Sequence, residues 1–504
     1  MSSTGTPARS SWSGKWAFIL AAAASAVGLG NMWRFPYLAA KYGGGTFLLT
    51  YLVLVFTFGV SLLLLETALG RTTGQSAIGA FKQFGKKYAF IGILASAVPF
   101  IITPYYCIIG GWVTKYTAAY LVNGPEALAD GGDFFTGFIT SNAESYIWML
   151  VFMAIVFVIV GLGVKGGIEK ANLFMMPALI IMAVAIAIYT LTMPGAVEGA
   201  LYYLTPDFSK FSPELVIGAL GQMFYSLSLA MGIMITYGSY TGKEVNLVRS
   251  TAMVCVFDTV VALLAGLAIF PSVAHFDPSL LGSSKGVALM FIILPQVFES
   301  MGSVGQVVSF AFFVMVDIAA ITSVVSLIEV VTQFVIQKFH VHRKRAALVV
   351  ACVCFVVSIP IGISLGHVAI LEESSPALFG LDWLTFFDEV TNTVLMPVCA
   401  LFSCIVVGWF ITPKRAVAEI EAEGTHMAGW LKKVYAVMIR FVTPALILIV
   451  EIGGLQSEIA AGNVAVIVFA YALVALCVVA YFAFFRNRDT GTNADEKLSG
   501  DYPV

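Results

Sequence analysis

Several oxygen-bearing side chains lie inside segments that are otherwise apolar. Asn31 and Asp258 belong to two such segments, and Thr322 and Ser323 stand side by side in a third. Carboxylate, amide, carbonyl and hydroxyl oxygens suit a hard cation such as Na⁺. Asp258 has no basic partner near it in the sequence, so we expect an ion beside it. The two adjacent hydroxyls either bind an ion or only hydrogen-bond back to their own helix.

The segment around Asn31 is interrupted. Residues 25–36 read Ser-Ala-Val-Gly-Leu-Gly-Asn-Met-Trp-Arg-Phe-Pro. Glycine permits uncommon backbone angles, and proline cannot donate to a helical ladder. Because backbone polar groups in hydrocarbon must find partners, a helix that opens there is expected to lie beside an ion or a substrate. The alternative is a kink whose glycines only let neighbouring helices pack closely.

The composition indicates a membrane-embedded chain. Of 504 residues, 59% are hydrophobic and 11% are charged, with a mean hydropathy of +0.93. Soluble domains carry about 25% charged residues, and a spanning helix needs about 20 apolar residues. We therefore predict an all-α polytopic membrane protein with about twelve transmembrane helices. The predicted spans are 15–39, 46–70, 89–122, 146–164, 171–191, 214–240, 247–271, 304–336, 345–366, 383–411, 431–452 and 463–485.

Charge predicts the orientation of these spans. With both termini in the cytoplasm, the inner segments hold 22 of the 27 lysines and arginines, whereas the outer loops are acidic. The apolar stretch Val287–Pro295 lies in a long outer loop and is too short to span, so we expect it to fold over the outer mouth.

Two halves of the chain share a layout. Residues 221–232, in the sixth span, again combine small and hydroxyl residues, and each interrupted segment is the first of five spans. Five is an odd number, so the second unit must insert upside down, and interrupted helices in matching positions indicate a central site. The predicted organisation is a cytoplasmic segment (1–14), a first five-helix repeat (15–191), an inverted repeat (214–411), helices 11 and 12 (431–485) and a cytoplasmic tail (486–504).

Further ionisable residues lie at the edges of this pattern. Glu66 either accepts hydrogen bonds from an opened neighbouring segment or lies at the inner interface, and Asp317 and Glu329 flank the Thr322 region. Arg34 and Asp388 fall near outer span ends, where they could pair across an opening. The sequence contains no visible nucleophile–base pair, metal-ligand cluster or phosphate-binding loop, so we expect neither an enzyme nor ATP-driven transport.

The sequence resembles the neurotransmitter:sodium symporter family, in its bacterial amino-acid transporter branch. Ala26–Pro36 is close to the first-helix signature of that family. The likeness continues through Gly43–Gly45, Glu66–Arg71, Tyr105–Tyr106, Gly221–Tyr240 and Ala319–Ser323. The resemblance implies an inverted five-helix repeat with discontinuous helices 1 and 6, as in the bacterial leucine transporter. It also implies a location in the bacterial cytoplasmic membrane.

Two Na⁺ sites, and no organic cofactor, are implied by this resemblance. The first site would combine the substrate carboxylate with the Ala26 carbonyl, Asn31, Ser226 and Asp258. The second would combine the Ala24 and Val27 carbonyls with Ala319, Thr322 and Ser323.

The resemblance also implies an amino-acid pocket between the broken helices. The amides of Leu29 and Gly30 and the Tyr106 hydroxyl would meet the substrate carboxylate, since helix N-termini favour anions. The other pocket residues would be Ala26, Ile102, Tyr225, Ser226, Ser228, Met231, Ser323 and Leu327. This lining carries no full charge, so a neutral, hydrophobic substrate is expected. The gating residues implied are Arg34, Asp388 and Tyr225 on the outside and Arg9 and Trp12 on the inside.

The sequence departs from the family pattern at a few positions. Ala230 replaces a glycine of the sixth span, and Asp258 stands where many members have asparagine. Gln337 occupies the position of an acidic residue in the inner latch, the contact through which Arg9 and Trp12 would tie the N-terminus to the bundle. The chloride site of the animal transporters would map to Tyr51, Gln222, Ser226 and Ala262. Ala262 supplies neither a hydroxyl nor a carboxylate to that site, so we expect Asp258 to provide the negative charge in place of chloride.

Together these features predict a Na⁺-coupled symporter that imports a neutral amino acid by alternating access without requiring chloride. Its partners would be the amino acid, Na⁺ and the lipid bilayer, with no nucleic acid, and it would be a monomer or a weak homo-oligomer. The alternatives are a Na⁺-leak channel and a transporter-like sensor of the same fold. A channel would need a continuous polar pore, whereas the polar residues cluster at mid-membrane.

Overall fold

The computed structural model describes residues 11–130, 132–282, 286–368, 378–421 and 427–484. These residues form α-helices joined by short 3₁₀- and π-helical segments, with only two isolated bridges between extended residues, Gly44–Pro206 and Leu378–Leu381. The all-α prediction is confirmed. The predicted segments 1–14 and 486–504 lie wholly or largely outside the described residues, and so does Arg9.

The first five predicted spans correspond to two bent or segmented pairs and three long helices. They comprise α1 (Lys15–Ala26), η1 (Gly30–Arg34), α2 (Phe35–Lys41), α3 (Gly45–Leu54), η2 (Val55–Gly59), α4 (Val60–Thr73), α6 (Ala89–Val122), α8 (Asn142–Gly161), η5 (Val164–Glu169) and α9 (Lys170–Leu191). The next five comprise α11 (Pro213–Ser226), α12 (Ile233–Ser239), α13 (Leu247–Phe276), α16 (Ser303–Phe339), α17 (Arg343–Val368), α18 (Trp383–Glu389), η9 (Val390–Leu395), α19 (Met396–Ile405) and η10 (Val406–Ile411).

The last two spans and the connections complete the chain. The spans are α21 (Gly429–Val437), η12 (Met438–Val442), α22 (Thr443–Ala460) and α23 (Val464–Phe484). The connections are α5 (Ala77–Phe84), η3 (Lys86–Tyr88), η4 (Glu126–Leu128), α7 (Asp133–Thr140), α10 (Ala196–Leu204), η6 (Phe208–Lys210), η7 (Pro278–Leu280), α14 (Gly286–Ala288), η8 (Leu289–Ile293), α15 (Leu294–Ser300) and α20 (Pro413–Ile420).

Length and apolar character mark most of these helices as spans. Within the described residues ten helices are long and apolar enough to cross a membrane, and the pair α1 and α2, bent by 47°, makes an eleventh. The predicted span 214–240 is divided into α11 and α12, each of which is too short to qualify alone. If α11 and α12 are counted together as one broken span, they add to the eleven spans above and give the predicted number of about twelve.

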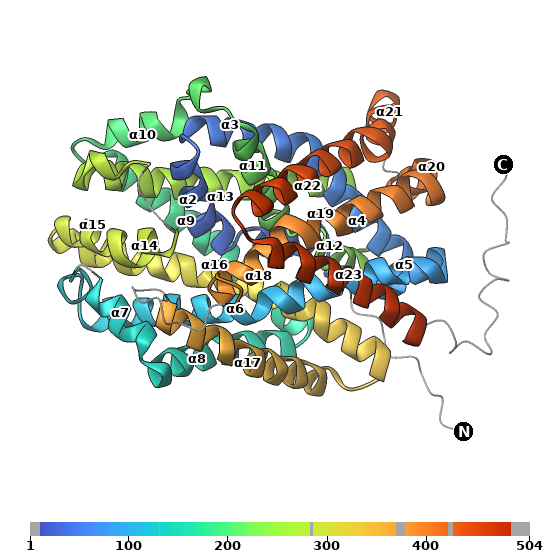
Figure 1. Cartoon of the computed structure of the whole chain (residues 1–504), viewed down its shortest axis with the longest axis horizontal. Coiled ribbons are helices and arrows are strands. Elements are labelled where there is room, and N and C mark those ends of the chain that lie inside the picture. Colours follow the sequence, from blue (N-terminus) through green and yellow to red (C-terminus); the bar gives the residue numbers. More distant parts are fainter. Residues whose placement is uncertain (1–10, 131, 283–285, 369–377, 422–426, 485–504) are drawn as a thin grey trace.

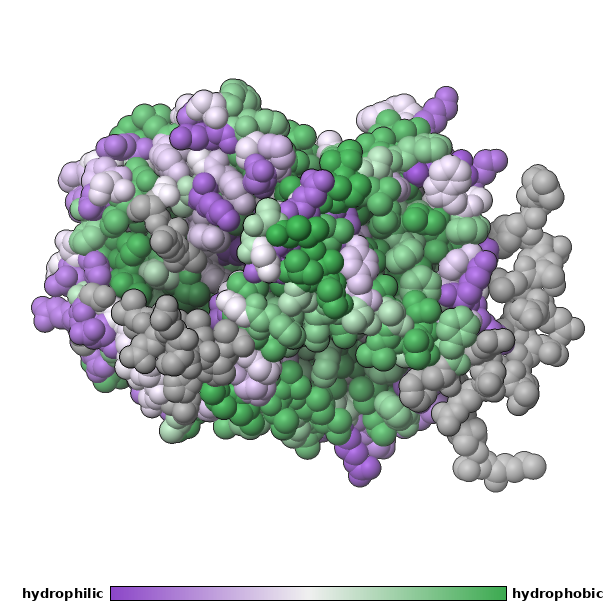
Figure 2. Space-filling model, viewed as in Figure 1, coloured by the Kyte–Doolittle hydropathy of each residue, from purple (hydrophilic) through white to green (hydrophobic). Residues whose placement is uncertain are grey.

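The bundle has two chemically different ends (Figure 1). Helices α5, α20 and α21 lie at one end, and α7, α10 and α15 lie at the other. The first group carries lysines 82, 414 and 432, and we call this the basic end. The second group carries Asp133, Glu198 and Glu299, and we call this the acidic end. Figure 2 shows apolar side chains dominating the middle of one face, with hydrophilic side chains mainly towards the ends.

Small residues allow the central helices to pack closely. Helix α12 runs against α4, and a Cβ atom on Gly70 would lie 1.9 Å from the Ile235 carbonyl oxygen. A Cβ atom on Gly238 would lie 2.3 Å from the Thr67 carbonyl oxygen. Only glycine fits at these two positions. The backbones of the two repeats therefore touch directly beside the break between α11 and α12.

The apolar stretch Val287–Pro295, which is too short to span, folds back onto the bundle. Residues 287–295 form the end of α14, all of η8 and the start of α15. Phe291 packs edge-on against Tyr116 of α6 with ring centroids 5.0 Å apart, and the Tyr116 hydroxyl donates to the Phe291 carbonyl oxygen at 2.9 Å. This segment therefore covers the half of α6 nearer the acidic end.

Candidate functional site

The first broken helix opens between α1 and η1. Val27, which follows α1, has extended backbone angles (φ −79°, ψ 104°) and leaves the helical path. A Cβ atom on Gly28 would lie 2.1 Å from Ser323 Oγ and 2.6 Å from the Tyr106 hydroxyl. The glycine is therefore required by close packing against α6 and α16, and the opening exposes backbone groups at the centre of the bundle.

The second broken helix opens between α11 and α12. Three residues of the connecting segment have positive φ angles: 53° at Ser228, 60° at Ala230 and 68° at Gly232. The Ala230 amide donates to Glu66 Oε1 at 2.7 Å, and Glu66 is buried. Glu66 thus satisfies a backbone group that the broken helix leaves without a helical partner, which is the first of the two roles expected for it.

Asp258 is the point where both broken helices meet. Its carboxylate accepts from Asn31 Nδ2 at 2.8 Å, from the Tyr51 hydroxyl at 2.5 Å and from Ser226 Oγ at 2.6 Å. Asp258 and Asn31 are 0% exposed, and all three donors are neutral. A buried carboxylate that is hydrogen-bonded but not paired with a cationic side chain can serve as a ligand for a bound cation. These residues therefore have the chemistry to hold a cation, as expected of the first Na⁺ site.

Serine hydroxyls link α1 to α16 and to the segment after α11. Ser323 Oγ donates to the carbonyl oxygens of Ser25 at 3.1 Å and Val27 at 3.4 Å. Ser25 Oγ donates to Ser326 at 2.7 Å and to Ser228 at 3.1 Å. Val27 and Ser323 of the expected second Na⁺ site are thus in contact.

The hydroxyl of Thr322, also expected at the second site, bonds back to its own helix. It donates to the carbonyl oxygens of Ile318 at 3.0 Å and Ala319 at 3.1 Å. The hydroxyl oxygen retains a lone pair for a cation while donating in this way. The contributions of Ser25 and Ser326 escaped the sequence interpretation. Ser326 lies one helical turn beyond Thr322, and this i, i+4 spacing places both residues on one face of the helix. That spacing was the feature of the sequence from which Ser326 could have been predicted to lie near the site.

A small cavity of about 20 Å³ lies between the broken helices, α6 and α16. Among the predicted pocket residues, those that line it are Ala26, Gly30, Ile102, Tyr106, Tyr225, Ser228, Met231, Ser323 and Leu327. The other lining residues are Ser25, Gly28, Ile233 and Ser326. Leu29 and Ser226 are not part of this lining. The volume is that of about one water molecule, so the described conformation is closed around the site.

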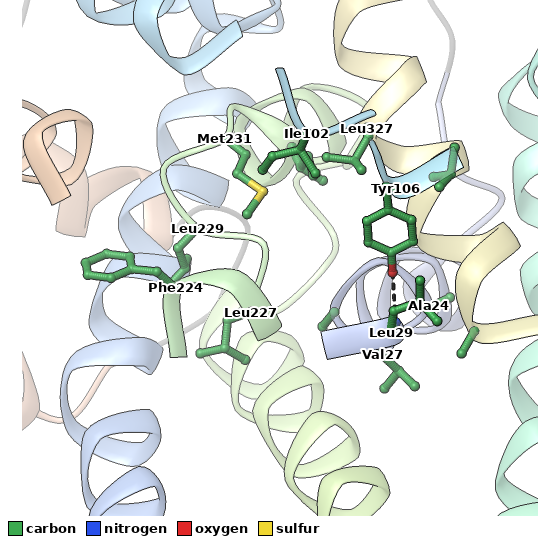
Figure 3. Close-up of a cluster of buried hydrophobic side chains, with 14 of the residues drawn as sticks. Ala24, Val27, Leu29, Ile102, Tyr106, Phe224, Leu227, Leu229, Met231 and Leu327 are labelled. Atoms are coloured by element: carbon green, nitrogen blue, oxygen red, sulfur yellow. Dashed lines mark hydrogen bonds between the residues drawn. The ribbon is translucent and has the colours of Figure 1, made fainter. Parts of the chain in front are cut away.

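Tyr106 faces the opened end of the first helix (Figure 3). Its hydroxyl accepts from the Leu29 amide at 2.8 Å, while Ile102, Met231 and Leu327 lie close to one another beside it. A polar group at one end and apolar side chains at the other suit a molecule with one charged end and an uncharged body.

On the side where outer gating residues were expected, the cavity is closed by aromatic rings and an ion pair. Tyr225 stacks with Tyr106 at a centroid distance of 6.5 Å, and the Arg34 guanidinium lies 5.6 Å from the Tyr225 ring centroid. Arg34 Nε is 3.8 Å from Asp388 Oδ2. Arg34 also donates to Gln222 Oε1 at 3.1 Å, a contact that the sequence interpretation did not anticipate. The three predicted outer gating residues are therefore brought together.

On the side of the basic end, Trp12 anchors the chain before α1. Its indole nitrogen donates to the Tyr237 carbonyl oxygen at 3.0 Å, and its ring packs edge-on against those of Tyr237 and Tyr240. The Ser13 amide donates to Glu169 Oε2 at 3.0 Å. Gln337, at the expected acidic position, instead accepts from Ser76 Oγ at 2.6 Å.

Two further acidic residues of α16, Glu329 and Asp317, lie in different environments. Glu329, which is 0% exposed, pairs with Arg343 and accepts from the Tyr240 hydroxyl at 2.7 Å. Asp317 accepts from Thr114 Oγ1 at 2.9 Å and thereby joins α16 to α6. Asp317 is not among the residues that line the cavity, and its hydrogen bond links two helices.

The model of the sodium:neurotransmitter symporter family matches residues 9–124 and 139–486. The chain belongs to this family. Among solved structures, bacterial MhsT in complex with L-phenylalanine is similar with a TM-score of 0.81 and 35% identity, over 88% of this chain and 100% of MhsT. The resemblance inferred from the sequence and the predicted fold are thus both confirmed.

Relatives extend across bacteria and animals. An uncharacterized sodium-dependent transporter of Bacillus subtilis is 34% identical over 444 residues, which are 87% of this chain and 96% of the relative. A human sodium- and chloride-dependent GABA transporter 2 is 27% identical over 470 residues, which are 83% of this chain and 75% of the relative. The chain is therefore a membrane transporter of a sodium-dependent symporter family.

Proposed function

We propose that this family member imports a neutral, hydrophobic amino acid together with Na⁺ by alternating access. The observation that carries the proposal is the convergence of Asn31, Tyr51 and Ser226 on Asp258. Oxygen atoms from both broken helices would bind one Na⁺ there, and the substrate carboxylate, held near Tyr106 and Leu29, would complete the site. This shared ligand would couple ion and substrate. A second Na⁺ between α1 and α16 would hold Val27 against Ser323.

The lining of the cavity supports the substrate class. Ile102, Met231 and Leu327 provide an apolar wall, and the cavity lining contains no charged side chain. The 35% identity with MhsT, whose structure contains L-phenylalanine, points the same way. The test is uptake of a panel of amino acids into proteoliposomes with and without an inward Na⁺ gradient. Hydrophobic amino acids should be taken up only with Na⁺, and binding or uptake independent of Na⁺ would refute the proposal.

The arrangement around Asp258 supports transport without chloride. Tyr51 and Ser226 are two of the residues that would hold chloride in the animal transporters, and both donate to the Asp258 carboxylate. A fixed negative charge would then occupy the place where a chloride ion is otherwise needed. Uptake should be unchanged when chloride is replaced by gluconate, and a collapse of uptake would contradict this part.

The same preparation distinguishes a symporter from a leak channel or a sensor of the same fold. A symporter gives saturable counterflow, a channel gives Na⁺ flux without saturable exchange, and a sensor binds substrate without flux. We further propose that the basic end faces the cytoplasm, because lysines 82, 414 and 432 lie there. Cysteine labelling of Lys82→Cys and Glu198→Cys from either side of right-side-out vesicles tests that orientation.

A further inference from the structure

We propose that a groove near the basic end binds one acyl chain of an anionic phospholipid, with the lipid headgroup at Lys338. The groove has a volume of about 430 Å³ and is bounded by α5, α6, α16 and α23. Its lining is apolar apart from Ser96 and Lys338. The Ser96 hydroxyl donates to the Gly92 carbonyl oxygen at 2.8 Å and is thereby satisfied within its own helix.

The groove has the depth and direction of a lipid tail in one leaflet. On α6 it extends from Ile93 to Phe100, and on α16 from Val331 to Phe339. Eight residues of helix span about 12 Å, and half of the hydrocarbon core is about 15 Å thick. Lys338 and Phe339 lie in the last turn of α16, so the cation and an exposed aromatic ring stand where headgroups meet hydrocarbon.

The charges at its mouth favour an anionic headgroup. Lys338 borders the groove, and Lys82 lies one helical turn beyond Ile78, a lining residue on the same face of α5. Basic pockets between transmembrane helices on the cytoplasmic side attract anionic lipids. An acyl chain also carries no polar groups that an apolar groove would leave unsatisfied, whereas a peptide backbone does. The lipid is therefore the occupant that fits both parts of the groove.

Occupancy of the groove should stabilise the contact between α5 and α16. The Ser76 hydroxyl, just before α5, donates to Gln337 of α16 at 2.6 Å, beside the headgroup position. The same helix carries Ser323 of the central site, two turns before Val331. A lipid packed between α5, α6 and α16 would hold this region together whatever substrate the protein transports.

Thermal unfolding of the delipidated full chain in detergent tests the proposal. Phosphatidylglycerol should raise the unfolding temperature saturably, and phosphatidylcholine with the same acyl chains should not. Lys338→Ala should weaken the response to phosphatidylglycerol about fivefold, the contribution of one lysine near an anionic surface, and Lys338→Arg should retain it. Equal responses to the two lipids would overturn the proposal.

A groove-filling variant and a photochemical probe locate the lipid. Ala97→Trp should abolish the phosphatidylglycerol response, whereas Ile181→Trp, on an exposed face of α9 at 68% exposure, should leave it intact. An unchanged response in Ala97→Trp would overturn the assignment. If that variant fails to fold, benzoylphenylalanine at position 97 can be photocrosslinked to whatever occupies the groove, and mass spectrometry then identifies the crosslinked molecule. A lipid adduct is expected, and crosslinking instead to residues 485–504 or to a second copy would overturn the proposal.

Discussion

Asn31 Nδ2 donates to Asp258 Oδ1 at 2.8 Å, and Ser226 Oγ donates to the same oxygen atom at 2.6 Å. Asn31 belongs to the first broken helix and Ser226 ends α11 of the second. A single carboxylate oxygen on α13 therefore contacts both broken helices. Any ion that binds at Asp258 changes the interactions of both helices at once, which is the physical requirement for coupling.

Asp258→Asn removes the negative charge of this side chain while nearly keeping its size, so the variant tests the contribution of the charge alone. The variant keeps one oxygen ligand but loses the negative charge, so the Na⁺ affinity should fall at least about tenfold, or about 1.4 kcal/mol. Uptake should also become stimulated by chloride. The measurement is the Na⁺ dependence of uptake in chloride and in gluconate. Asp317→Asn, outside the cavity, is the matched control and should keep the parental Na⁺ dependence.

Glu66 should stabilise the opened segment of helix 6 through one hydrogen bond. Glu66→Ala leaves the buried Ala230 amide without its partner and should lower the free energy of unfolding by about 1–3 kcal/mol. Glu66→Gln keeps the Oε1 acceptor. Its new amide group replaces Oε2, which has no hydrogen-bond partner among the described residues, so its effect should be smaller. Equal unfolding temperatures for the two variants would show that the hydrogen bond is not the cause.

Ala230→Gly should relieve backbone strain. Ala230 has a φ angle of 60°, a conformation that costs an L-residue about 1–2 kcal/mol and costs glycine little. We expect the variant to unfold at a higher temperature than the parent. The matched control is Ala219→Gly in the regular helix α11. Its free energy of unfolding should fall by about 1 kcal/mol, so it should unfold at a lower temperature than the parent. A destabilised Ala230→Gly variant would contradict the strain interpretation.

The broken segments and the approximate span limits could be predicted because they depend on local chemistry. A glycine pair, an asparagine and a proline in an apolar run are visible without knowing any neighbour. The same holds for Asp258, whose unusual position inside a span is evident from the sequence. The family resemblance then implied that Asn31, Ser226 and Asp258 share one Na⁺, and the structure brings these three side chains into hydrogen-bond contact.

The parts that escaped prediction depend on contacts between distant segments. Nothing local to Gln337 indicates that Ser76 is its partner, because 261 residues separate the two. Arg343 begins the basic run Arg343–Lys344–Arg345 next to two histidines, a pattern typical of a solvated surface, yet it pairs with the buried Glu329. Asp317 likewise needed the pairing of α16 with α6 before its bond to Thr114 could be seen. Such pairs follow from helix packing, which the sequence pattern does not specify.

The Glu329–Arg343 pair should be strongly coupled. Glu329 is 0% exposed, and Arg343, whose side chain is 19% exposed, also donates to the Val160 carbonyl oxygen at 2.9 Å. Glu329→Gln leaves a largely buried guanidinium without its counter-charge, which should cost about 3 kcal/mol, the lower end of the usual range because Arg343 keeps some contact with water.

A double-mutant cycle with Arg343→Met measures this coupling. The double variant removes both charges and should be more stable than Glu329→Gln alone, because no uncompensated charge remains. The free energies of unfolding of the four proteins, obtained from urea titrations in detergent, give the coupling energy, which we expect to exceed about 1 kcal/mol. Lys115 and Glu144, a partly exposed pair near the acidic end, provide the control cycle and should couple by less than about 1 kcal/mol. Additive effects at Glu329 and Arg343 would show that the two charges do not depend on each other.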